Sequence, residues 1–339
     1  MKKLSKFGIA VMAILACVSV ASCKKVNLDD QNGDVYVVQL GLGGELDVDY
    51  EPLTRAGSDD LYGIQVYSTP DNGEENPSWK YYAYGLFDNM ENVTISLLKG
   101  YKYKFVATMV VDGKNKIVTD RDKFYHPFNK SGDNYGPCAI TNMFDYQSTT
   151  YLGELGRGNT FVKNPNEIVA HANTERYYGE LSDYVPGSNG GKAKIKMKRV
   201  NFGAKFVAKG KAETVGSKLE IQIKDAQKIE LLVEQNNKQV SDIFTFSNVA
   251  AAWAANGTYS EVVTVNVNWH REDGSVVPLG SHEITFKRNA TTVINVAVVN
   301  DGSADGVGVE IEEEEFVEDG EEVTVEDGKL VDTEVDTNN

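Results

Sequence analysis

Apolar residues occupy every second position in residues 38–42 and again in residues 46–50, with polar residues or glycine between them. A period of two predicts β-strands that bury one face. Gly43 and Gly44 separate the two runs and predict a bend, and Pro52 ends the pattern. The region from 35 to 50 is therefore predicted to be an extended segment with one buried face.

The same alternation recurs in short segments along the rest of the body, with Asp-Gly and Lys-Gly dipeptides as turns between them. Only residues 167–176 have a pattern that suits a short helix. Such a series of short strands and turns is typical of β-sandwiches, and its length predicts two in tandem. Further strands are predicted at residues 61–68, 79–87, 93–98, 101–111, 192–198, 202–208, 218–224, 229–233, 263–269, 282–287 and 292–299.

The N-terminus has the pattern of an export signal. Lys2, Lys3 and Lys6 precede an apolar run at residues 7–20 that is too short to span a bilayer as a helix. The run ends in Val20-Ala21-Ser22-Cys23, which resembles the lipobox of bacterial lipoproteins, where small residues precede a cysteine that accepts diacylglycerol. We therefore expect lipid on Cys23 to anchor the protein to a membrane.

The cysteines are consistent with this reading. Cys17 is a poorer lipid acceptor because Leu15 is bulky and the apolar run before it is shorter, and an ordinary secretory peptide with an incidental cysteine is the alternative. If Cys17 leaves with the signal and Cys23 is acylated, Cys138 has no intrachain disulfide partner. We read Cys138 as an incidental thiol in a loop, and expect the fold to depend on its core alone.

These features divide the chain of 339 residues into six parts. The linker is the most evident boundary, because Pro186 and the following Gly187-Ser188-Asn189-Gly190-Gly191 combine several turn-forming residues. The parts are a signal peptide at 1–22, a tether at 23–34, an N-terminal sandwich at 35–186 with a removable first strand, the linker at 187–191, a C-terminal sandwich at 192–300 and a tail at 301–339.

Charge is concentrated in the tail. Residues 301–339 contain sixteen acidic residues and one lysine, which gives −15 of the chain's −16. No basic stripe is present, so nucleic acid is not an expected partner. The tail is nevertheless able to form strands, because apolar residues alternate with polar ones within it, and we take it as a candidate donor strand. The residues concerned are Val307, Val309, Ile311, Val323 and Val325.

The sequence offers no catalytic, cofactor-binding or metal-binding residues. Nucleotide-binding and hydrolase motifs are absent, and the histidines have no ligand at metal-site spacing. We therefore expect a protein that is not an enzyme and has no cofactor. The aromatic segment 79–87 suits core packing, with a sugar-stacking surface as the alternative. The histidines are His126, His171, His270 and His282.

Two short segments, together with the lipobox, resemble a known protein family. The loop Leu53-Thr54-Arg55-Ala56-Gly57, followed by Asp59-Asp60, and the later Met197-Lys198-Arg199-Val200 resemble fimbrillins of the Bacteroidales, the lipoprotein-derived subunits of type V pili. The resemblance covers the whole layout from signal to tail, through short motifs in a given order. It implies two transthyretin-like sandwiches, a location at the outer membrane or in an extracellular fimbria, and other fimbrial subunits as partners.

The resemblance also implies a maturation step. A trypsin-like protease would cut after an arginine in an early loop, and a strand from another subunit would then fill the vacated groove. The matching bond is Arg55-Ala56, since only this arginine follows a first strand and precedes small residues. Arg121, Arg157 and Arg176 were also expected in loops.

Other interpretations of the same pattern exist. Residues 35–50 and 307–325 would be permanent edge strands of one copy if no exchange occurs. The chain would then be an anchor subunit that keeps its lipid and is never cut, or a monomeric lipoprotein that binds a surface glycan or another ligand.

Overall fold

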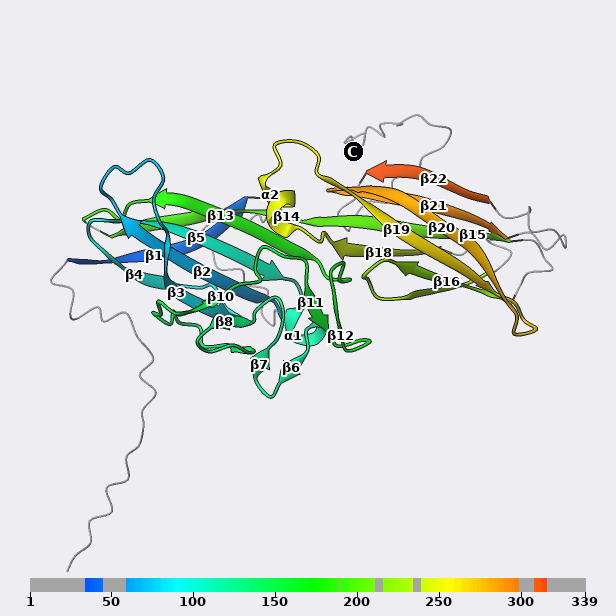
Figure 1. The fold of residues 1–339 in the computed structure, drawn as a ribbon, viewed down its shortest axis with the longest axis horizontal. Helices are drawn as coiled ribbons and strands as arrows, with labels where there is room; N and C mark the ends of the chain where they lie inside the picture. Colours follow the sequence, from blue (N-terminus) through cyan, green and yellow to red (C-terminus); the bar gives the residue numbers. More distant parts are fainter. Residues whose placement is uncertain are drawn as a thin grey trace, which may run out of the picture.

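The computed structural model describes residues 34–44, 59–188, 190–210, 216–233, 239–298 and 308–315. These residues form an elongated molecule with two β-rich domains side by side (Figure 1). The predicted all-β class is confirmed. Several predicted sites lie outside the described residues: Cys23, Arg55, Ala56, Val307, Val323 and Val325.

The first domain is built on one seven-stranded sheet. Its strands form where the sequence alternates, as in the strand at 191–199, where Ala193, Ile195 and Met197 are buried between lysines. In spatial order the strands are β3 (Lys80–Phe87), β2 (Leu61–Pro70), β5 (Tyr101–Val110), β13 (Arg176–Tyr184), β14 (Gly191–Arg199), β1 (Val35–Gly44) and β4 (Thr94–Leu98).

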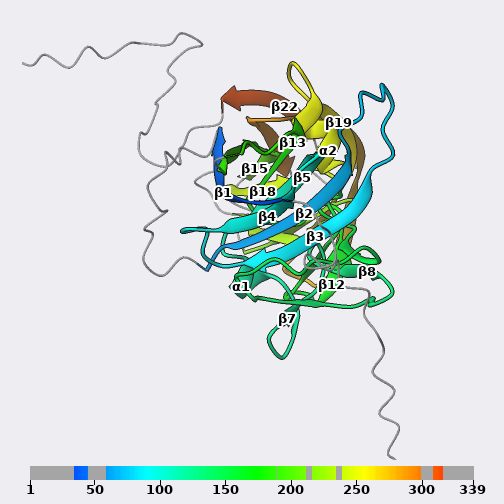
Figure 2. The same cartoon turned by 90° about the vertical axis from the view of Figure 1, so that its left-hand side faces the viewer.

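This sheet curves strongly, so that it encloses its own core (Figure 2). Its two end strands, β3 and β4, come into contact, and the Tyr82 hydroxyl of β3 donates a 2.7 Å hydrogen bond to the Ser96 carbonyl of β4. Apolar side chains from all seven strands form one core cluster. A single curved sheet thus provides both walls that two separate sheets provide in other sandwiches.

Smaller elements from residues 113–169 lie along the lower side of the first domain and toward the second domain (Figure 1). The helix predicted at 167–176 is wrong. Residue Asn166 adopts a left-handed turn (φ 71°) that joins two short antiparallel strands, and β13 already begins at Arg176. The elements are α1 (Gly113–Lys116), β6 (Thr119–Asp120), β7 (Lys123–Phe124), β8 (Lys130–Gly132), β9 (Cys138–Ala139), β10 (Thr150–Leu152), β11 (Thr160–Val162) and β12 (Glu167–Val169).

The second domain is a sandwich of two four-stranded sheets. Phe202 lies in its centre and stacks on Phe286 with 4.4 Å between ring centroids. One sheet has the order β18 (Gln239–Thr245), β15 (Asn201–Gly210), β21 (Ala290–Val298) and β22 (Gly308–Glu315). The other has the order β17 (Ile229–Leu232), β16 (Lys218–Ile223), β19 (Ser260–His270) and β20 (Val276–Lys287).

The predicted domain boundary is wrong. Within the predicted linker, Gly187 and Gly190 form an isolated bridge in the hairpin between β13 and β14, and Gly190 has a left-handed φ of 74°. The strand that follows belongs to the first sheet, and the chain passes into the second domain near Val200. The cluster of turn residues was read correctly as a break between strands, but a turn does not reveal which sheet the next strand joins.

The two domains share one hydrophobic core. The helix α2 (Val249–Ala254) of the second domain packs on β14, and its Trp253 Nε1 donates a hydrogen bond of 3.1 Å to the Lys196 carbonyl. Arg176 is fully buried near this junction, and its guanidinium donates to the carbonyls of Leu155 and Arg157. Among the described residues, no helix has the length and apolar character needed to cross a bilayer.

Candidate strand-exchange site

β1 is an interior strand of the first sheet although it comes first in the described chain. It pairs in parallel with β14 from Val38 opposite Gly191 onward, and antiparallel with β4 from Val35 opposite Leu98 onward. Its connection to the body, residues 45–58, contains Arg55 and lies outside the described residues. β1 is thus held by backbone pairing on both sides and joined covalently through the segment with the predicted cleavage bond.

The inner face of β1 supplies three side chains to the first core. Val38, Leu40 and Leu42 have 0%, 3% and 6% of their surface exposed, whereas Val37 on the other face is 59% exposed. Burial of three aliphatic side chains corresponds to about 5–9 kcal/mol of gross transfer free energy. We call the space that β1 fills between β14 and β4 the β1 slot. Without β1, this slot would open directly into the core.

β4, one wall of the β1 slot, has no other sheet partner among the described strands. Tyrosine hydroxyls bind its outer edge instead. Ser96 N–H donates to Tyr146 Oη at 2.8 Å, and Leu98 N–H donates to Tyr103 Oη at 2.7 Å. Tyr103 Oη also donates to the Leu98 carbonyl at 3.2 Å, and Tyr82 Oη donates to the Ser96 carbonyl.

These three side chains, Tyr82, Tyr103 and Tyr146, are named here the tyrosine clamp. Tyr82 comes from β3 and Tyr103 from β5, so the clamp ties β4 to the opposite part of the curved sheet. Burial raises the pKa of Tyr82 and Tyr103 above the usual value, which keeps both hydroxyls protonated and able to donate. The clamp satisfies an exposed edge that would otherwise attract another strand, and it holds β4 independently of β1.

β14, the other wall, carries a row of lysines at alternate positions. Lys192, Lys194 and Lys196 are in register with Gln39, Gly41 and Gly43 of β1. A Cβ atom on Gly43 would overlap the Cε atom of Lys194, so the glycine gives this lysine room to lie across β1. Next in the row, Lys198 donates to the Trp253 carbonyl at 2.9 Å.

The described part of the acidic tail is a strand of the second domain. β22 lies at the edge of its sheet and pairs antiparallel with β21, with Val309 opposite Val296 and Ile311 opposite Ile294. Of the candidate donor residues, these two are therefore paired within the same copy. β22 and the β1 slot belong to different domains, in different halves of the molecule (Figure 1).

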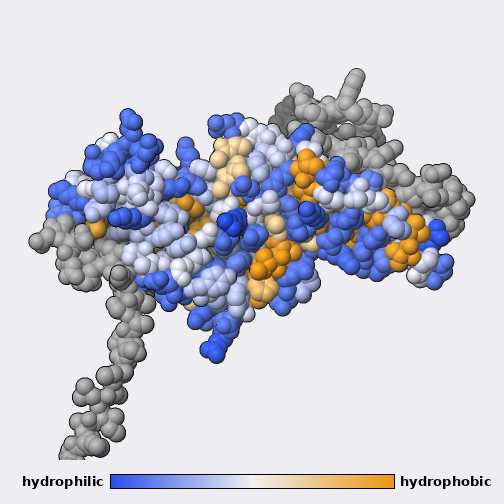
Figure 3. Space-filling view, viewed as in Figure 1, coloured by the Kyte–Doolittle hydropathy of each residue, from blue (hydrophilic) through white to orange (hydrophobic). Residues whose placement is uncertain are grey.

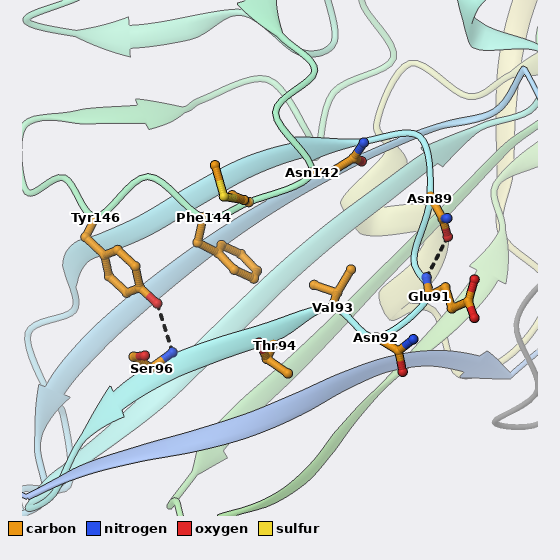
Figure 4. A pocket seen from close by; sticks show the side chains of 10 residues that line it. Asn89, Glu91, Asn92, Val93, Thr94, Ser96, Asn142, Phe144 and Tyr146 are labelled. Carbon is orange, nitrogen blue, oxygen red and sulfur yellow. Dashed lines mark hydrogen bonds between the residues drawn. The ribbon is translucent and has the colours of Figure 1, made fainter.

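A shallow cavity of about 400 Å³ lies beside the outer edge of β4 (Figure 4). Tyr146 borders it and turns its hydroxyl toward the backbone of Ser96. Phe144 packs edge-on against Phe87, with 5.1 Å between centroids, and Asn142 Nδ2 donates to Asp88. The lining residues are Asn89, Glu91, Asn92, Val93, Thr94, Ser96, Asn142, Met143, Phe144 and Tyr146.

The aromatic segment 79–87 packs into the core, as predicted, because Tyr82, Tyr84 and Phe87 are all buried. Tyr81 is half-buried and stacks on Tyr151 from β10, with 3.8 Å between ring centroids. On the face seen in Figure 3, apolar residues gather mainly toward the middle and the second domain, while the first-domain end is largely hydrophilic. The sugar-stacking alternative for this segment is therefore reduced to Trp79 and Tyr81, which are only partly buried.

The remaining candidate chemistry is structural. Cys138 lies in β9, not in a loop; it is buried, and burial raises the pKa of its thiol to about 11. Arg176 lies in β13 rather than in a loop, and only Arg121 and Arg157 are exposed. Within the described residues, no group of three His, Cys, Asp or Glu is placed to hold a metal ion.

Sequence reasoning missed the tyrosine clamp. Alternation placed Tyr103 on the buried face of a strand, which predicts packing but not a hydroxyl partner. Tyr82 and Tyr146 are 64 residues apart, so no local spacing indicates that they meet the same strand. The lysine row, in contrast, is visible directly as alternation with Ala193, Ile195 and Met197.

No protein-family model matches this chain, and no curated protein matches it either. Among solved structures, it is similar to the fimbrial anchor protein Mfa2 from Porphyromonas gingivalis, at 10% identity and a TM-score of 0.34, over 82% of this chain and 97% of that one. It is also similar to the tip fimbrial protein Mfa3 of that organism, at 11% identity and a TM-score of 0.29, over 83% and 98%. Likeness at this level assigns no function, so the proposal below depends on the chain's own residues.

Proposed function

We propose that this chain is a structural subunit of a cell-surface fimbria. It is exported as a lipoprotein on Cys23, cut between Arg55 and Ala56, and polymerised by strand exchange. The observation that carries the proposal is the position of β1, an interior strand whose covalent link to the body is the segment that contains Arg55. A trypsin-like protease, other subunits and the outer membrane are its partners.

Strand exchange needs a slot that remains open after β1 has left. Loss of β1 would expose unpaired backbone groups on β14 and β4, together with an apolar channel, which is a template for an incoming strand. The tyrosine clamp supports this step because it holds β4 from the side opposite β1. Without such a clamp, β4 would be free to collapse onto β14 and close the slot.

The acidic tail is the proposed donor. β22 is bonded on one side only, at the edge of its sheet, so it leaves with fewer hydrogen bonds broken than an interior strand. The β1 slot of the same copy lies in the other domain. A donor from a neighbouring copy therefore connects the second domain of one subunit with the first domain of the next.

The test is limited proteolysis of the mature chain, without its lipid, by an arginine-specific protease. We predict that the first cut falls after Arg55 and that the product forms SDS-resistant oligomers. The variant Arg55→Gln should stay intact and monomeric. The matched control Arg121→Gln removes another exposed arginine and should behave as wild type.

A protein that is cut after Arg55 but keeps its N-terminal fragment and remains monomeric would contradict the proposal. That result would instead support one of two other functions, an anchor subunit that keeps its lipid or a ligand-binding lipoprotein. The cavity beside β4 favours ligand binding, because amide, hydroxyl and aromatic side chains line it together, as suits a sugar.

A further inference from the structure

The lysine row faces a β1 that offers it no negative charge. Opposite Lys192, Lys194 and Lys196, the strand carries glutamine and two glycines. Opposite charges at paired positions of adjacent strands stabilise a sheet, and the glycines leave the outer face of β1 without side chains where the lysines pass. β1 therefore fits the slot through its backbone pairing and its inner face, and its residues 38–43 carry no charge.

We propose that the lysine row selects the acidic donor strand of a second copy of this chain. The donor runs in the same direction as β1, with Glu310 opposite Lys194 and Glu312 opposite Lys196. This inference rests on the proposed strand exchange and adds the recognition that makes the tail a better occupant than β1.

The pattern of the tail matches the slot position by position. Residues 307–312 read Val-Gly-Val-Glu-Ile-Glu, and residues 38–43 read Val-Gln-Leu-Gly-Leu-Gly. In the parallel alignment, three aliphatic residues take the three buried places of β1, and the two glutamates take the places of Gly41 and Gly43. The outer face of the donor thus presents carboxylates where β1 has none.

The opposite direction fits less well. If residues 307–311 ran antiparallel to β1, the aliphatic residues would still face the core, but Glu310 would lie opposite Lys192. Gly308 would then lie opposite Lys194, which would meet no carboxylate. The parallel alignment forms two charge pairs and the antiparallel one forms a single pair.

In its own domain, the donor strand β22 pairs with β21, which carries no charged residue. In the pairing of β22 with β21, Glu310 is opposite Asn295 and Glu312 is opposite Val293. Both partners are uncharged and buried. In the slot of a neighbour, the directly paired strand would carry lysines opposite these glutamates, and opposite charges at paired positions stabilise that pairing.

The test measures the rate of polymerisation of the protein already cut after Arg55, by light scattering and SDS-resistant ladders. The acceptor variant Lys194→Glu/Lys196→Glu and the donor variant Glu310→Lys/Glu312→Lys should each polymerise about tenfold more slowly than wild type. The chain that carries all four substitutions should recover most of the rate, because opposite charges again face each other. Raising the salt concentration should slow wild type, because it screens the attraction, and should speed the slow variants, because it screens the repulsion between like charges.

The matched control is Lys80→Glu/Lys123→Glu, which changes the net charge equally at two exposed lysines outside the slot, and it should polymerise as wild type. Equal melting temperatures before cleavage check that the variants fold. If the acceptor variant polymerises at the wild-type rate, or if the fourfold variant stays slow, the charge recognition is wrong while strand exchange stands. If wild type itself forms no polymer after the cut, the proposed function fails and this inference fails with it.

Discussion

Tyr103 uses its one hydroxyl for both backbone groups of Leu98, at 2.7 and 3.2 Å, and it is fully buried. Its replacement by phenylalanine keeps the ring and removes the oxygen, so that a buried N–H and a buried C=O lose their partner. An unsatisfied buried polar group lowers stability by about 1–3 kcal/mol.

We therefore predict that Tyr103→Phe lowers the free energy of unfolding of the uncut protein by about 1–3 kcal/mol, measured with urea. The loss should be larger in the protein that has lost β1, because β4 then depends on the clamp alone. The control Tyr101→Phe changes a half-buried tyrosine of the same strand and should have little effect. Equal losses for the two variants would show that the clamp does not hold β4.

At the residue scale, the sequence predicts which face of a strand is buried better than it predicts which groups a side chain hydrogen-bonds. The buried positions of β1 and the lysines of β14 follow from alternation alone. The position of Arg176 does not follow from alternation, and the sequence predicts it in a loop. In the structure it is fully buried and hydrogen-bonded to Thr108 and to two loop carbonyls. Burial lowers the pKa of its guanidinium to about 9. A buried cation held by neutral acceptors has no local sequence signal.

At the element scale, the two exchanging strands are expected to respond differently to removal. A truncation before β22 takes away an edge strand, and β21 still pairs with β15. We predict that this truncated chain stays folded, with a melting temperature lowered by roughly 5 °C, and that it forms no polymer after cleavage.

A shorter truncation, of residues 317–339, is the control for this experiment. It removes Val323 and Val325 but keeps β22, and polymers should still form if residues 307–315 are the donor. Polymers from the longer truncation would exclude β22 as the donor. Unfolding of the longer truncation would instead show that β22 belongs to the permanent core of the second domain.

Most predicted strands agree with the structure in position and differ by a few residues at their ends. The errors occur where tertiary pairing decides. Residues 167–169 form a strand because β11 lies beside them, despite a composition that suits a helix. The strand after the glycine-rich turn joins the first sheet because β13 and β1 border it there, which alternation cannot reveal.

At the scale of the whole molecule, the slot and the donor belong to different domains that share a hydrophobic core. Contact between the slot of one copy and the donor of the next is heterologous, so it continues from subunit to subunit instead of closing a symmetric dimer. The sequence predicted two β domains and an acidic tail, but not the shared core, because contacts between distant residues are not encoded in local patterns.

The central claim is that β1 is removed and its place is taken by another copy. It is tested most directly by the N-terminal residue of the subunit isolated from polymers on the cell surface, determined by Edman degradation and intact mass. The account predicts an N-terminus at Ala56 with no lipid. Polymers whose subunits all begin at an acylated Cys23, with residues 35–44 still attached, would contradict it.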